Sequence, residues 1–204
     1  MRLLLAIALA AGTPVTHHTS AGTKAARASL LSAADFGKGW TGAKAAQRGI
    51  LVSCPGHAPS AKGIVETGAA ASPTFSAAQT GPFVQQNTSV YASAAQAGTW
   101  WSRAVTPTLV TCVADDLSAL AARGVKVKLD SAAKLPVTTT ATHTAGFRVI
   151  ATANGKKLYM DVIVIGSGAT ITDITISSFI NPVPAKTEQA LAKLVARKLG
   201  GPSA

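Results

Sequence analysis

The hydrophobic pattern is most regular between Phe147 and Phe179, where three runs rich in β-branched residues are separated by two turn signals. The first is Asn154-Gly155, a dipeptide favoured in two-residue type I′ turns because both central residues need positive φ. The second is Gly166-Ser167-Gly168, which suits a slightly longer loop. The segment therefore predicts an antiparallel three-stranded meander, around which the rest of the chain is expected to pack.

The first turn fixes the register of the first two strands, since it places Ala153 opposite Lys156 and Arg148 opposite Asp161. A three-residue second loop then places Asp173 beside Asp161. Because side chains alternate across a strand, one face of this meander is nearly all apolar and is expected to form the core. That face carries Phe147, Val149, Leu158, Met160, Val162, Val164, Ile174 and Ile176.

The opposite face of the meander is mixed. Two neighbouring carboxylates repel unless a cation joins them, and Arg148 is the cation that this register supplies. Two interpretations stay open: a cross-strand ion pair on a solvated face, or a polar spot on a concave, ligand-facing sheet. A one-residue error in the second loop would remove the arrangement altogether. The mixed face carries Arg148, Ile150, Tyr159, Asp161, Ile163, Ile165, Ile171, Asp173 and Thr175.

Helical periodicity marks two further regions. The first covers residues 93–124; it begins with a capping-box pair, Ser93 and Gln96, and restarts at Thr106-Pro107. The second covers residues 184–200 and carries an apolar stripe with basic residues near its end. With the meander, these helices predict an α+β fold, in which an antiparallel sheet has helices packed on one face of a single domain.

The N-terminus has the pattern of an export signal. One arginine precedes a short apolar run that ends in small residues, which predicts a signal peptide over residues 1–11. This run is too short to span a bilayer. Residues 12–28 are rich in Thr, Ser, Gly and Ala, and we expect a disordered linker there. The folded domain is then expected to cover residues 29–204.

Cysteines and charge narrow the picture further. Cys54 and Cys112 are the two cysteines, and two cysteines in an exported chain most often pair, so one disulfide is expected. Loop entropy puts such a bridge at roughly 4 kcal/mol. The formal net charge of +11 favours anionic partners such as an envelope polymer. The basic residues are scattered along the chain, however, so we expect no nucleic acid as partner. We also expect the chain to be a monomer.

Candidate chemistry is sparse. The chain lacks Gly-x-Ser-x-Gly, His-Glu-x-x-His and a P-loop, and no cysteine–histidine cluster indicates zinc. His57 and His143 are the candidate bases of the mature domain, although His57 is expected in a surface loop. Asp161 and Asp173 are the candidate acid/base pair. We therefore predict a non-enzymatic protein without cofactor or metal, in which Trp101, next to Trp100, is a candidate aromatic platform.

Several motifs together resemble a known group. They are the Ala-Ala-Asp-Phe-Gly-Lys-Gly-Trp opening at 33–40, a lone loop cysteine, Leu-Val-Thr-Cys-Val-Ala at 109–114, a Tyr-Met-Asp-Val-Ile-Val strand and an amphipathic C-terminal helix. Over residues 30–199 this layout resembles the exported sensor-like domains of actinobacteria, typified by the extracellular domain of PknH-type serine/threonine kinases and by related lipoproteins. The resemblance implies an antiparallel sheet with helices on one face and a ligand-binding cleft on the other.

The chain differs from this group in carrying one cysteine pair instead of two disulfides, and in lacking a kinase domain, a transmembrane helix and a lipidation cysteine. The resemblance therefore implies a secreted, non-catalytic ligand-binding or sensor-like domain of the bacterial cell envelope, which takes an extracellular small molecule. The alternatives are a basic protein that binds anionic envelope polymer, and a hydrolase. The expected ligand-binding residues are Arg148, Tyr159, Asp161, Asp173 and Trp101.

Overall fold

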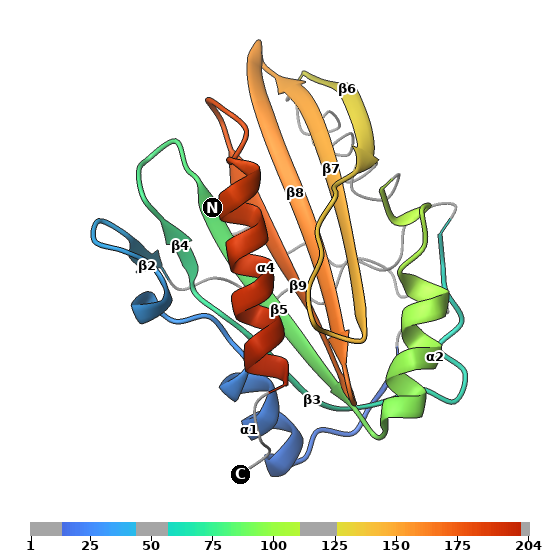
Figure 1. Ribbon diagram of the computed structural model, residues 1–204. Coiled ribbons are helices and arrows are strands. Elements are labelled where there is room, and N and C mark those ends of the chain that lie inside the picture. The colour runs from blue at the N-terminus through green and yellow to red at the C-terminus, as the bar shows by residue number, and fades with distance from the viewer. Residues whose placement is uncertain (1–13, 44–56, 111–125, 201–204) are drawn as a thin grey trace, which may run out of the picture.

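A single nine-stranded sheet runs through the part of the chain that the computed structural model describes, residues 14–43, 57–110 and 126–200 (Figure 1). Its main path has the strand order β1-β3-β5-β9-β8-β7-β6, and β4 joins β2 to β5. The strands are β1 (Val15–Thr16), β2 (Thr41–Ala43), β3 (Val65–Ala71), β4 (Thr74–Ser76), β5 (Phe83–Tyr91), β6 (Val127–Lys134), β7 (His143–Ala153), β8 (Lys156–Ser167) and β9 (Thr170–Ser178). The helices are α1 (Ser20–Ala28), the 3₁₀ helix η1 (Ala33–Asp35), α2 (Ala94–Ala104) and α4 (Ala185–Leu199). The predicted combination of a large sheet with helices is confirmed.

The first hairpin of the meander forms as predicted. Ala153 pairs with Lys156 and Arg148 pairs with Asp161 across β7 and β8. Asn154 and Gly155 between them have φ values of 49° and 78°, as a type I′ turn requires.

The second hairpin differs from its prediction. Ser167 pairs with Thr170, so the turn between β8 and β9 has two residues, and Gly168 supplies the positive φ of 55°. Gly166 stays inside β8, where a Cβ would lie 3.2 Å from the ring of Trp101. The predicted three-residue loop is therefore wrong, because Gly166 serves close packing and not the turn. Asp161 lies opposite Ile176 instead of Asp173.

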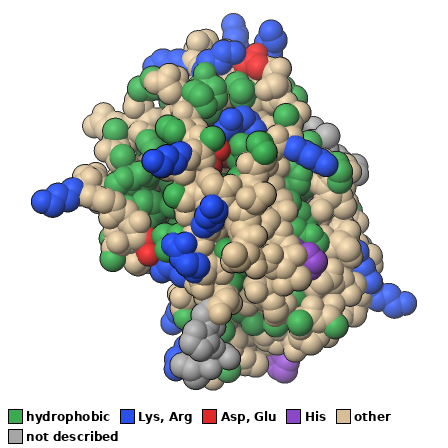
Figure 2. Space-filling model, in the orientation of Figure 1, with side chains coloured by type: hydrophobic (Ala, Val, Ile, Leu, Met, Phe, Trp, Pro, Cys, Tyr) green, Lys and Arg blue, Asp and Glu red, His purple; other side chains and the backbone are tan. Residues whose placement is uncertain are grey.

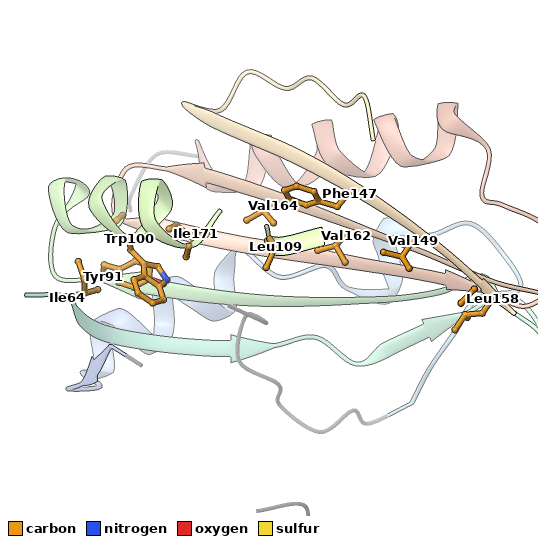
Figure 3. Packing of buried hydrophobic residues seen from close by; sticks show 13 residues of the cluster. Ile64, Tyr91, Trp100, Leu109, Phe147, Val149, Leu158, Val162, Val164 and Ile171 are labelled. Atoms are coloured by element: carbon orange, nitrogen blue, oxygen red, sulfur yellow. The ribbon is translucent and has the colours of Figure 1, made fainter. Parts of the chain in front are cut away.

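Helices cover both faces of the sheet, which corrects the prediction that they pack on one face. On one side, Leu191 and Val195 of α4 pack in a cluster with Ile163 of β8. On the other side, Trp100 of α2 packs in a cluster with Val164 of the same strand (Figure 3). Adjacent residues of a strand point to opposite faces, so α4 and α2 lie on opposite faces. We call them the α4 face and the α2 face.

The segment predicted as a disordered linker, residues 12–28, is ordered over its described part. Val15 pairs with Val65 of β3, and the Thr19 hydroxyl caps α1 by accepting from the Gly22 amide at 3.0 Å. A Cβ on Gly22 would lie 2.3 Å from the Thr67 carbonyl oxygen. The small residues that resemble a linker composition therefore let α1 pack directly on the backbone of β3.

Several predictions fall on residues that the structure does not describe. These are the signal peptide over 1–11, both cysteines of the expected disulfide, Cys54 and Cys112, and the second part of the helical region over 93–124. The first part of that region is α2, where half of the predicted capping box forms, because the Ser93 hydroxyl accepts from the Gln96 amide at 3.2 Å. The Gln96 side chain does not return to Ser93, since its Oε1 accepts from the Val65 amide of β3 at 2.8 Å. None of the described helices has the length and hydropathy of a membrane span.

Candidate functional site

Arg148 and Asp161 form a bidentate ion pair under helix α4. Arg148 Nε donates to Asp161 Oδ1 at 2.7 Å, and Nη2 donates to Oδ2 at 2.9 Å. Nη2 also donates to Oε1 of Glu188, in the first turn of α4. Both carboxylate side chains are 1% exposed, whereas Arg148 is 27% exposed. The predicted cross-strand ion pair therefore forms, but its carboxylates are buried under α4 and do not lie on a solvated face. We call these three residues the arginine cluster.

The arginine cluster holds more negative than positive charge when both carboxylates are ionised. Burial raises the pKa of Glu188 to about 7, the neighbouring Asp161 carboxylate raises it as well, and Arg148 opposes both effects. The hydrogen bonds that Arg148 donates to Asp161, and the two negative charges, raise the pKa of Arg148 against the opposing effect of its partial burial. Near neutral pH the cluster therefore exchanges a proton at Glu188, while Arg148 remains a cation.

Glu188 is the member of the cluster that the sequence prediction missed. It is the acidic residue of an otherwise basic helix, and it lies in line with the buried stripe at Leu191, Ala192 and Val195. An acidic side chain at a core-facing position needs a buried partner, and that is the signal that could have identified it.

Asp173 lies on the α2 face, where it pairs with Asn87 of β5. Asn87 Nδ2 donates to Asp173 Oδ2 at 3.1 Å. Within the described part of the chain, Asn87 Oδ1 and Asp173 Oδ1 are buried without a hydrogen-bond partner. Burial raises the pKa of Asp173 to about 7. Asp161 and Asp173 therefore point to opposite faces, and the carboxylate pair predicted for acid/base chemistry does not form.

The two adjacent tryptophans lie in different environments. Trp100 is 2% exposed and belongs to the core, whereas Trp101 is partly exposed and stacks on His143, with ring centroids 5.0 Å apart and planes at 18°. The rings of Trp101 and His143 both lie beside Gly166 on the α2 face. Trp101 thus shares a face with Asp173. Tyr159, by contrast, lies two residues from Asp161 on β8, so its side chain is on the α4 face together with that of Asp161.

His57 is buried and not in the expected surface loop. Its Nε2 donates to the Ala104 carbonyl oxygen at 3.0 Å, at the last residue of α2. Carbonyls at a helix end lack partners within the helix, so this bond stabilises the C-terminus of α2. Since His143 stacks on Trp101, both histidines that were candidate bases are occupied in packing contacts.

A pocket of about 610 Å³ lies between the end of α2, the segment that follows β6, and the first half of β7. This volume is within the range of sites for small molecules. Most of its lining is apolar, and none of the five predicted ligand-binding residues belongs to its described lining. Its walls are Val105, Thr106, Pro107, Lys134, Leu135, Pro136, Val137, Thr144, Ala145, Gly146 and Phe147. We call it the α2–β7 pocket.

Polar groups are few in the α2–β7 pocket. The Thr106 hydroxyl oxygen is buried, and no described residue is its hydrogen-bond partner. The Thr144 hydroxyl, in contrast, is bonded to that of Thr139 at 2.6 Å. Lys134 is an exposed lining residue, and its ammonium group places a positive charge at the pocket. The pocket therefore offers a mostly apolar surface and a cation, with one buried and unbonded hydroxyl in a residue of its wall.

No family model matches the chain, and no curated protein matches it. The similarity to actinobacterial sensor-like domains therefore rests on the sequence motifs alone. Across the described residues, no three His, Cys, Asp or Glu side chains gather as a metal site would require.

Proposed function

We propose that the chain is a non-catalytic ligand-binding domain, which takes up a small and largely apolar molecule in the α2–β7 pocket. The observation that carries this proposal is the pocket itself, with a volume of about 610 Å³ and a mostly apolar lining. Small-molecule sites typically combine such a lining with a few polar groups that orient the ligand.

The polar groups of the pocket favour a ligand with an acidic head. The Thr106 hydroxyl oxygen is buried without a described partner, so turning this side chain toward a ligand oxygen would satisfy a buried polar group. The ammonium of Lys134 would attract a negative charge at the same pocket. The apolar body would then contact Val105, Pro107 and Phe147.

The residues predicted from the sequence support this role less well. Arg148 and Asp161 satisfy each other and hold α4, so they offer a ligand little hydrogen-bonding capacity. Asp173 lies on the other face, so no carboxylate pair supports a hydrolase. In this proposal the domain acts in the cell envelope, where the predicted leader would deliver it and where Cys54 and Cys112 would form their disulfide.

The test uses anilinonaphthalene sulfonate, a fluorescent aromatic anion whose emission rises in apolar surroundings. Ala145→Phe places a ring inside the pocket, whereas Ala133→Phe makes the same change at an exposed position of β6 outside it. We expect saturable binding to the wild type, at least about tenfold weaker binding to Ala145→Phe, and unchanged binding to Ala133→Phe. Equal binding to both variants would rule out the α2–β7 pocket as the site.

A further inference from the structure

The strand register brings the ends of four strands, β6, β7, β8 and β9, to one end of the sheet, the end at which β7 turns into β8. Val127, at the start of β6, pairs with Ala153, at the end of β7. Ser178, at the end of β9, pairs with Tyr159, near the start of β8. The chain just before β6, the β7–β8 turn and the chain just after β9 therefore project from the same end, shown at the top of Figure 1.

This end concentrates exposed apolar side chains. Of the large hydrophobic residues that the structure shows as exposed, Leu129, Phe179 and Ile180 lie here, at 43%, 45% and 59% exposure. Phe83 contacts Phe179 edge to face, with ring centroids 6.1 Å apart, and so supports its ring. The other one, Val15, lies on the edge strand β1 toward the opposite end. Phe179 and Ile180 follow β9 and Leu129 lies on β6, so β8 and β7 separate them, but all three share this end of the sheet. Exposed apolar side chains rimmed by polar residues are typical of interaction surfaces.

The same end is basic. Lys126, Lys128, Lys156 and Lys157 are all exposed there. Asp130 offsets one of these charges, because its carboxylate lies 2.8 Å from Lys157 Nζ. Figure 2 shows Lys and Arg side chains gathered at this end of the molecule. We call the whole set the tip surface: Lys126, Lys128, Leu129, Lys156, Lys157, Phe179 and Ile180.

We propose that the tip surface docks on a membrane surface that contains anionic lipid. Lysines are attracted to anionic headgroups, and apolar side chains gain free energy by entering the boundary between headgroups and acyl chains. An anionic polymer would account for the lysines but would leave Phe179 and Ile180 exposed to water. The β7 residues of the α2–β7 pocket, 144–147, lie in the half of the strand away from the tip. Docking would therefore leave the pocket accessible, and this inference does not depend on the proposed function.

Vesicle flotation with the full chain tests the proposal. We expect binding to vesicles of phosphatidylglycerol mixed with phosphatidylcholine, little binding to phosphatidylcholine alone, and release by sodium chloride. The double variant Lys128→Gln/Lys156→Gln should lower partitioning roughly 25-fold, at about fivefold per lysine. Ile180→Ser and Leu129→Ser should each lower it by about tenfold, since the apolar contact is lost.

Matched controls separate the tip from general charge and hydrophobicity. Val15→Ser removes an apolar side chain that is 66% exposed, and Lys193→Gln/Arg197→Gln removes two exposed charges from α4. Both should partition like the wild type. The proposal is overturned if the chain does not float with the anionic vesicles. It is also overturned if the two serine variants at the tip bind as the wild type does while soluble polyglutamate competes, because an anionic polymer would then be the partner.

Discussion

Replacing Arg148 by methionine removes the cation that contacts the Asp161 and Glu188 carboxylates in the described structure. Methionine keeps much of the apolar stem, so the change mainly deletes the three charged hydrogen bonds. Both carboxylates are 1% exposed and would stay buried without a partner. Breaking a buried ion pair in this way costs about 3–5 kcal/mol. A domain is typically stable by only about 5–15 kcal/mol, so the loss should be plain.

The size of this loss should depend on pH. Without the guanidinium, the pKa of Glu188 rises further, because burial and the repulsion from the Asp161 carboxylate are no longer opposed. Protonation then relieves the cost at low pH. The variant should therefore lose most stability near about pH 8 and clearly less near about pH 5.

Urea unfolding followed by circular dichroism measures both quantities, provided that the denaturant slope is unchanged. Glu188→Gln is the matched control, because it removes one carboxylate and keeps the Arg148–Asp161 pair. We expect it to change the free energy of unfolding by less than about 1 kcal/mol near neutral pH. A loss below about 1 kcal/mol in Arg148→Met, or an equal loss at both pH values, would refute the description of this cluster as a buried anchor.

Three further predictions concern the buried carboxyls and the packing of α1 on β3. Glu188 and Asp173 both have a folded-state pKa of about 7, above the ordinary 4.5 and 3.8, so the wild type should lose stability as pH rises from about 4 to about 7. Asp173→Asn supplies an amide to the unpartnered Asn87 oxygen and removes a buried carboxylate. It should raise the free energy of unfolding by on the order of 2–4 kcal/mol near pH 8 but by much less near pH 5. Equal melting temperatures for the variant and the wild type near pH 8 would contradict this. Gly22→Ala should destabilise the domain by more than about 1 kcal/mol, because the added Cβ meets the β3 backbone. Gly98→Ala, in open space within α2, should stabilise the domain by up to about 1 kcal/mol. Thermal unfolding that ranks the two variants in the other order would contradict the α1–β3 packing.

Local signals predicted some elements of the fold and missed others. The Asn154-Gly155 turn was predictable because both residues act locally, through their tolerance of positive φ. The next turn was not, because two glycines competed for it and the packing of Trp101 decided that Gly166 belongs to the strand. That contact joins α2 to β8, and no local pattern contains it. An error in one loop then moved Asp173 to the opposite face.

Composition misled at helix α1 but carried an informative signal in strand β8. Helix α1 is made of small residues, so it resembles a linker until the backbone of β3 is beside it. The run Val162 to Ile165 is buried throughout, and a continuous apolar run is typical of a strand covered on both faces. This run was the available sign that helices lie on both sides of the sheet.

The candidate site was less predictable than the fold. Its walls come from residues 105–107, 134–137 and 144–147, and each of these stretches looks like an ordinary connection or strand start. Only the sheet register and the position of α2 bring them together. The ion pair of Arg148 and Asp161 was predictable from one hairpin, but its burial depends on Glu188 from a distant helix.

The central claim is that the α2–β7 pocket binds a small apolar molecule, and a nuclear magnetic resonance titration tests it most directly. The isotope-labelled chain would be titrated with anilinonaphthalene sulfonate, and the backbone amide signals would be followed. We predict that the largest shifts fall on the pocket residues, foremost Thr106, Ala145 and Gly146. Shifts confined to Phe179 and Ile180 at the tip, or no saturable shifts, would contradict the claim.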